Sequence, residues 1–139
     1  MQETIETPSI QTTTYPLLGD RIQSSVIDAV FMIIMMFIIS SILDNYENVP
    51  DWVRISLFVA VWLVYDPVCT SLGCTLGNYI KGLRVRQYSD ETRRINIFQA
   101  IIRYVIKFSL GWISFLTINL NPEKRAIHDY FVGSVVIKN

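Results

Sequence analysis

The 139-residue chain is 51% hydrophobic, and its twelve basic and twelve acidic residues give a formal net charge of zero. This length allows one domain, and a neutral chain gives no reason to expect nucleic acid as a partner. The apolar residues form long blocks separated by charged loops, unlike the even spread of a soluble core. The composition therefore favours an integral membrane protein whose main partner is the lipid bilayer.

Residue types that bind metals or perform catalysis are scarce. The chain has one histidine, His128, and two cysteines, Cys69 and Cys74. A zinc site needs about four nitrogen or sulfur ligands, so we expect no metal and no cofactor. His128 and Asp129 are adjacent, but no serine or cysteine nucleophile accompanies them in a catalytic pattern. We therefore expect no catalytic residues and no enzymatic activity.

The first apolar block follows an N-terminal segment that lacks helical periodicity. Residues 1–18 are rich in threonine, glutamine and proline, which predicts a flexible tail before a membrane domain at residues 19–139. Ile22–Leu43 contains 22 residues with one charge, Asp28. About 20 apolar residues in a helix cover a hydrocarbon core of roughly 30 Å. We predict a first transmembrane helix here.

The second block predicts a return through the membrane. Residues 44–51 form an acidic loop without basic residues, and Trp52–Val68 is a second apolar run that ends at an Asp-Pro pair. The following loop, residues 70–96, has five basic and two acidic residues. By the positive-inside rule, the N-terminus and this basic loop should lie on the cytoplasmic side of the cell membrane.

Two segments outside these spans have strand-like patterns. Within the basic loop, LRVRQY and RRINIF flank the turn sequence SDET, which predicts a small β-hairpin. The end of the chain, after residue 122, reads as a short amphipathic turn followed by a strand-like tail. The predicted fold class is an all-α membrane protein with a small cytoplasmic β element.

The third apolar block, Ile97–Leu120, allows more than one arrangement. Arg103 and Lys107 lie one helical turn apart within it, and residues 104–120 give only 17 positions for a crossing. The block is long enough to span the membrane, to enter and leave on one side, or to lie at the interface as an amphipathic helix. We predict a third membrane-associated segment, either spanning or re-entrant.

Three short motifs occur in order along the chain. They are RIQSSVID at residues 21–28, GCTLGNYIKGLRV at residues 73–85 and RAIHDYFVGSVVI at residues 125–137. Together with the apolar blocks they resemble the RDD family of small membrane proteins, named for one arginine and two aspartates. The resemblance covers residues 20–137. It implies a small transporter, with exchange of monovalent cations for protons as one suggested activity.

The resemblance also assigns individual residues. Arg21 and Asp28 match the family's arginine and first aspartate, and Asp129 is the best match for the second. The chain departs from the family pattern at Asn78, where a basic residue usually stands, which weakens any anion site at that position. Because both later motifs lie in basic segments, they should share the cytoplasmic side. This favours a re-entrant or interfacial third segment over a third crossing.

Placing the predicted spans brings several charged residues together near the cytoplasmic side. The members of this charge cluster are Arg21, Asp28, Asp66, Arg103 and Asp129. One interpretation is structural: the two arginines neutralise Asp28 and Asp66 and hold the helices together. The other makes Asp28 an ion or proton site, because carboxylates inside membranes often mark transport pathways. The sequence leaves both interpretations open.

Three glycines, Gly73, Gly77 and Gly82, follow the second span. Small residues four apart let membrane helices approach closely, whereas glycine loops can also present amides to an anion. We interpret this segment as a close-packing loop.

Two functional hypotheses remain. The first is transport of a small solute, or exchange of monovalent cations for protons, through the charge cluster. The second is a non-transporting membrane subunit or scaffold that docks partners through its basic cytoplasmic loop. Because two or three spans enclose little volume, we expect a homo-oligomer or a membrane partner protein.

Overall fold

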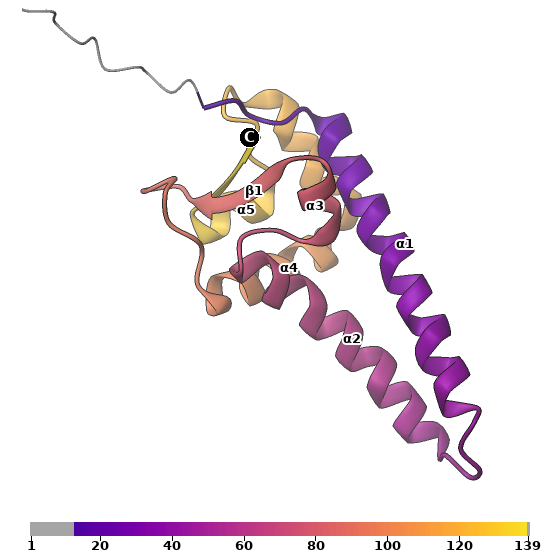
Figure 1. The fold of residues 1–139 in the computed structure, drawn as a ribbon. Helices are drawn as coiled ribbons and strands as arrows, with labels where there is room; N and C mark the ends of the chain where they lie inside the picture. The colour runs from indigo at the N-terminus through magenta and orange to yellow at the C-terminus, as the bar shows by residue number, and fades with distance from the viewer. Residues whose placement is uncertain (1–12, 139) are drawn as a thin grey trace, which may run out of the picture.

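Two long helices form a hairpin that extends away from the rest of the molecule (Figure 1). The computed structural model describes residues 13–138, so the predicted tail lies outside the described residues as far as residue 12. Helix α1 covers Leu18–Leu43 and helix α2 covers Asp51–Ser71. Both are long and apolar enough to cross a membrane, which confirms the two predicted spans. Only 6% and 11% of their most apolar windows are buried, as expected of helices that face lipid.

The third apolar block is a bent pair of helices. Helix α4 covers Ile97–Leu110, and the 3-10 helix η1 covers Gly111–Leu120. The direction of the chain changes by 103° between Ile97–Leu110 and Ile113–Leu120. Gly111 has a φ of +51° at this bend, a conformation that glycine adopts without the strain of a side chain. A bend of this size is found in broken spans and in re-entrant segments, the two arrangements predicted for the block.

A two-stranded antiparallel sheet joins distant parts of the chain. Strand β1, Leu83–Gln87, pairs with strand β2, Ser134–Lys138, and places Val85 opposite Val136. The predicted hairpin between residues 83–88 and 93–98 is therefore wrong, although the predicted strand-like tail is present. Asn96 begins α4 with a capping box, in which its backbone N–H donates to the Gln99 side chain. This helix start prevents the chain after the turn from pairing with β1.

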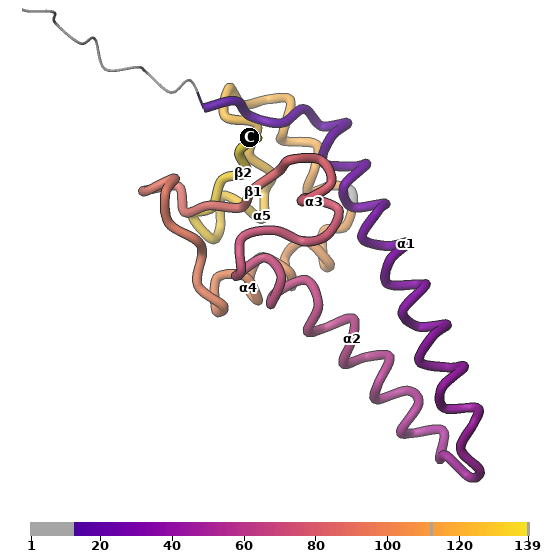
Figure 2. Tube along the Cα trace, viewed as in Figure 1, coloured from indigo at the N-terminus to yellow at the C-terminus, as the bar shows by residue number. Residues whose placement is uncertain are grey.

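Two short helices complete the fold. Helix α3, Leu76–Ile80, follows α2, and helix α5, Ile127–Val132, precedes β2. The sheet, α3 and α5 gather where α1 begins and α2 ends, while the 44–50 loop lies at the opposite end of the hairpin (Figure 2). A small apolar core joins the sheet to α4; its members are Leu83, Val85, Ile95, Ala100 and Val136. The fold thus has a membrane hairpin and a compact body at one end.

Candidate functional site

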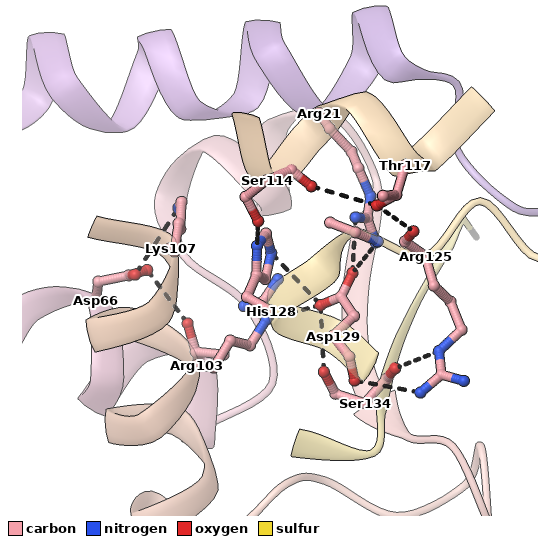
Figure 3. Close-up of polar contacts among 12 residues, drawn as sticks. Arg21, Asp66, Arg103, Lys107, Ser114, Thr117, Arg125, His128, Asp129 and Ser134 are labelled. Carbon is pink, nitrogen blue, oxygen red and sulfur yellow. Dashed lines mark hydrogen bonds and ion pairs between the residues drawn. The ribbon is translucent and has the colours of Figure 1, made fainter. Parts of the chain in front are cut away.

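Asp129 lies at the centre of the body and has no solvent exposure. Arg21 from α1 places Nη1 2.7 Å from its Oδ2 atom, and Arg103 from α4 places Nε 2.9 Å from its Oδ1 atom (Figure 3). Both arginines are buried as well, with 5% and 7% exposure. Charge-assisted hydrogen bonds between buried groups are strong, so this cluster connects α1, α4 and α5 firmly.

Neutral donors complete the surroundings of Asp129. The Ser134 hydroxyl donates to Oδ1 at 3.2 Å, and the Ala126 backbone N–H donates to Oδ2 at 3.1 Å. Arg125 stacks between two tyrosine rings and donates to the backbone carbonyls of Asp129 and Ser134. Each carboxylate oxygen thus has at least two donors. We call this group, formed by Asp129, Arg21, Arg103 and Ser134, the Asp129 clamp.

The clamp has a fixed charge state near neutral pH. Burial alone would raise the pKa of Asp129, but the charges of Arg21 and Arg103 hold it well below its usual value. Burial lowers the pKa of the neighbouring His128 to about 3, although Asp129 partly opposes this shift. The imidazole is therefore neutral, and its Nε2 atom, 3.5 Å from Asp129 Oδ1, forms no ion pair. Its Nδ1 atom shares a hydrogen bond with the Ser114 hydroxyl.

Asp28 has entirely different surroundings on α1. Its Oδ1 atom accepts hydrogen bonds from the Tyr65 hydroxyl at 3.0 Å and the Gly77 backbone N–H at 2.7 Å. Its Oδ2 atom accepts one from the Thr75 hydroxyl at 2.6 Å. Among residues 13–138, no lysine, arginine or histidine forms an ion pair with it. Asp28 is thus held by uncharged donors only, which we call the Asp28 site.

Helix α3 and its N-cap residue bring two of these donors to α1, and α2 contributes the tyrosine. A Cβ atom at Gly77 would lie 2.0 Å from the Ser24 carbonyl oxygen, so only glycine permits this approach. Thr75 caps α3 by accepting from the Asn78 backbone N–H. Gly73 and Gly82 have φ values of +123° and +67°, so these two positions suit glycine because of backbone conformation.

Asp66 on α2 interacts with α4 through a third charged contact. Its Oδ2 atom lies 3.8 Å from Lys107 Nζ, and the Thr70 hydroxyl donates to Oδ1 at 3.3 Å. The predicted pairing of Arg21 and Arg103 with Asp28 and Asp66 is therefore wrong. Arg21 lies near the start of α1, beside α5, whereas Asp28 lies about 10 Å further along that helix. The arginine consequently reaches Asp129 instead of Asp28.

Two cavities connect these groups. The larger, about 430 Å³, lies between α1, α2, α4 and η1, and its wall includes Asp28, Asp66 and Lys107. The smaller, about 20 Å³, is lined by four of the five residues of the predicted charge cluster, namely Arg21, Asp28, Asp66 and Arg103. The fifth, Asp129, contacts both arginines. The structure thus brings the five residues together: the two arginines contact Asp129 and also line the smaller cavity, whereas Asp28 and Asp66 line both cavities.

Sequence reasoning left several site residues outside the charge cluster. Lys107 lies one helical turn from Arg103 in the sequence, but this spacing indicates no partner for it. Tyr65 and Thr75 are the donors to Asp28, and neither residue type signals such a role by itself. Thr75 lies inside the motif at residues 73–85, which is the available signal for it. The role of Tyr65 depends on how closely α2 approaches α1 in the folded protein, which the sequence does not show.

Comparisons with known proteins place the chain among membrane proteins. An 82-residue region is 33% identical to the uncharacterized membrane protein YteJ of Bacillus subtilis (strain 168) and covers 55% of this chain. It spans about half, 48%, of that protein. No solved structure matches the chain. The model of the RDD family matches residues 15–133, a range that includes Asp28, Asp129 and both arginines of the clamp, and the chain therefore belongs to the RDD family of membrane proteins.

Proposed function

We propose that this RDD protein exchanges a cation for a proton across the membrane and that Asp28 is the exchange group. One proton leaves the carboxyl group as one monovalent cation binds, so the site has the same net charge before and after exchange. The observation that carries this proposal is that Asp28 accepts hydrogen bonds from three neutral donors and has no cationic partner among the described residues.

The position of Asp28 supports this role. It lies ten residues after the start of α1, about 15 Å along the helix axis, and lines the 430 Å³ cavity. A carboxylate at this depth is expensive to maintain and is usually functional. Asp129, by contrast, is fully enclosed by its donors and offers no space for an exchanging ion. We assign it a positioning role, in which it holds Arg21 and Arg103.

The proposal includes an orientation. The basic segment at residues 70–96 and the body that contains it would face the cytoplasm across the cell membrane, because positive loops are retained on that side. Asp28 would then lie in the cytoplasmic half of the span. A transport path through so small a protein would be completed by a second copy or a membrane partner.

Flux measurements in proteoliposomes test the exchange. An inward gradient of sodium, potassium or lithium should drive protons out of vesicles that contain the wild-type protein. Asp28→Asn should abolish this proton flux. Asn keeps the side-chain shape but cannot bind or release a proton at neutral pH. Glu47→Gln is the matched control, because Glu47 is an exposed carboxylate in the 44–50 loop and should retain full flux.

Two outcomes would overturn the proposal. The first is equal flux in Asp28→Asn and the wild type at matched insertion. The second is no flux in the wild type with any of the three ions. The second result would favour the alternative, a subunit that docks a partner through exposed basic residues. Arg93, which is 76% exposed, and Arg94, also exposed, are the candidates for that role, and their replacement would then abolish partner association.

A further inference from the structure

The large cavity is far bigger than a bare monovalent ion requires. Its volume of about 430 Å³ falls within the range of sites for organic ligands, roughly 300–1,000 Å³. Its walls come from four elements, including Val26 and Met32 of α1, Trp62 of α2, Phe108 of α4 and Phe115 of η1. These side chains are apolar or aromatic. The cavity therefore suits a ligand with a sizeable hydrophobic body.

The charged side chains in the wall determine the sign of the ligand. Two carboxylates, Asp28 and Asp66, face one ammonium group, that of Lys107. The ammonium lies 3.8 Å from Asp66, so Asp28 remains without a cationic partner among the described residues. Arg21 and Arg103 line the smaller cavity rather than this one, and both form ion pairs with Asp129. The wall thus has a net negative charge and complements a cation.

The aromatic residues strengthen this preference. Trp62, Tyr65, Tyr104, Phe108 and Phe115 all contribute to the wall. The faces of aromatic rings attract organic cations, and the attraction is largest where water is excluded. An anionic lipid or a neutral apolar molecule would gain neither this attraction nor the contact with Asp28. Charge and shape therefore select the same class of ligand.

We infer that this cavity binds an amphipathic organic cation, whose positive group lies beside Asp28 and whose hydrophobic body fills the space between α1, α2, α4 and η1. This inference deepens the proposed exchange, on which it rests for its link to transport, because it adds organic cations to the inorganic cations that Asp28 would exchange. Binding itself depends only on the cavity and its charge.

Binding of tetraphenylphosphonium to the full-length protein in lipid nanodiscs tests the inference. We expect saturable binding by equilibrium dialysis, and no saturable binding of tetraphenylborate, an anion of nearly the same shape. Asp28→Asn should weaken binding roughly tenfold, the effect of about 1.4 kcal/mol, whereas Glu47→Gln should leave it unchanged. Equal binding of the two probes, or full affinity in Asp28→Asn, would overturn the inference.

A second variant guards against loss of folding in Asp28→Asn. Ala29 also lines the cavity, so Ala29→Phe should occupy part of the volume and weaken binding without removing a charge. Wild-type affinity in Ala29→Phe would count against this cavity as the binding site. Unfolding temperatures in the same nanodiscs show whether each variant is folded.

The same preparation separates this inference from the proposed exchange. Asp28-dependent binding of tetraphenylphosphonium without proton flux would support the site and overturn the exchange. Proton flux driven by sodium or potassium and lost in Asp28→Asn, together with no binding of tetraphenylphosphonium, would support the exchange and overturn the organic-cation site.

Discussion

Asp28 and Asp129, the two aspartates that the sequence resemblance predicts as motif residues, have opposite surroundings within one small body. Asp129 is fully buried and contacts two arginines, whereas Asp28 contacts only two hydroxyls and one backbone N–H. Asp28 is also in the wall of the large cavity, which Asp129 is not. Arg21 forms its ion pair with Asp129, and Asp28 has no cationic partner among residues 13–138. The difference separates a structural carboxylate from one that can bind a ligand.

The largest effect is expected when the clamp is broken. Asp129→Asn would leave two buried guanidinium groups without their counter-charge, and removing one partner of such a cluster costs about 3–5 kcal/mol. We therefore expect severe loss of folded protein and a much lower unfolding temperature in detergent. Asp28→Asn should cost far less, because no buried charge loses its partner and the amide oxygen can still accept from Tyr65 and Gly77. Equal destabilisation by the two variants would refute the distinction between the two carboxylates.

A smaller effect is expected where the Asp28 site is built by close packing. Gly77→Ala introduces a Cβ atom 2.0 Å from the Ser24 carbonyl oxygen and 3.0 Å from Asp28 Cγ, so α3 must move away from α1. Overpacking of this kind typically costs about 1–3 kcal/mol. The displacement also removes the Gly77 N–H bond to Asp28, so the variant should lose both unfolding temperature and flux.

Gly19→Ala is the control for this substitution. Gly19 is also helical, and a Cβ atom there would meet nothing within 4 Å. We expect this variant to be as stable as the wild type or slightly more stable, because alanine is the better helix former. An unfolding temperature of Gly77→Ala equal to that of Gly19→Ala would show that α3 does not press against α1 as described.

The extent to which the sequence predicts this molecule differs between the spans and the body. The two spans follow directly from length and apolarity, since a bilayer imposes both. The partner of β1 could not be read in the same way, because Leu83–Gln87 and Ser134–Lys138 are separated by more than forty residues. Local patterning favoured the nearer hairpin, and the capping box at Asn96 was the signal against it.

The candidate site shows a similar limit. One interpretation of the sequence paired Arg21 and Arg103 with Asp28 and Asp66. Which charges pair depends on where α5 and the loop before α3 lie relative to α1, and these are long-range contacts. The motif identified Arg21, Asp28 and Asp129 as the residues to follow. Only the packed structure shows that Arg21 contacts Asp129 and that Asp28 lines a cavity.

The smallest expected effect concerns the protonation of the clamp region. Because burial holds the pKa of His128 near 3, below about 6.5 in the unfolded chain, acid favours unfolding as the pH falls between these values. The effect is at most about 1.4 kcal/mol per pH unit. His128→Asn cannot take up this proton, and its amide oxygen can still accept from Ser114, so its unfolding temperature should fall less between pH 6.5 and 5.

Below about pH 4 both proteins should lose stability, since the low pKa of Asp129 makes its contribution disappear on protonation. If the unfolding temperatures of the wild type and His128→Asn depended on pH in the same way, His128 would not be shielded from water. The clamp region and the Asp28 site would then differ only in the charges of their residues.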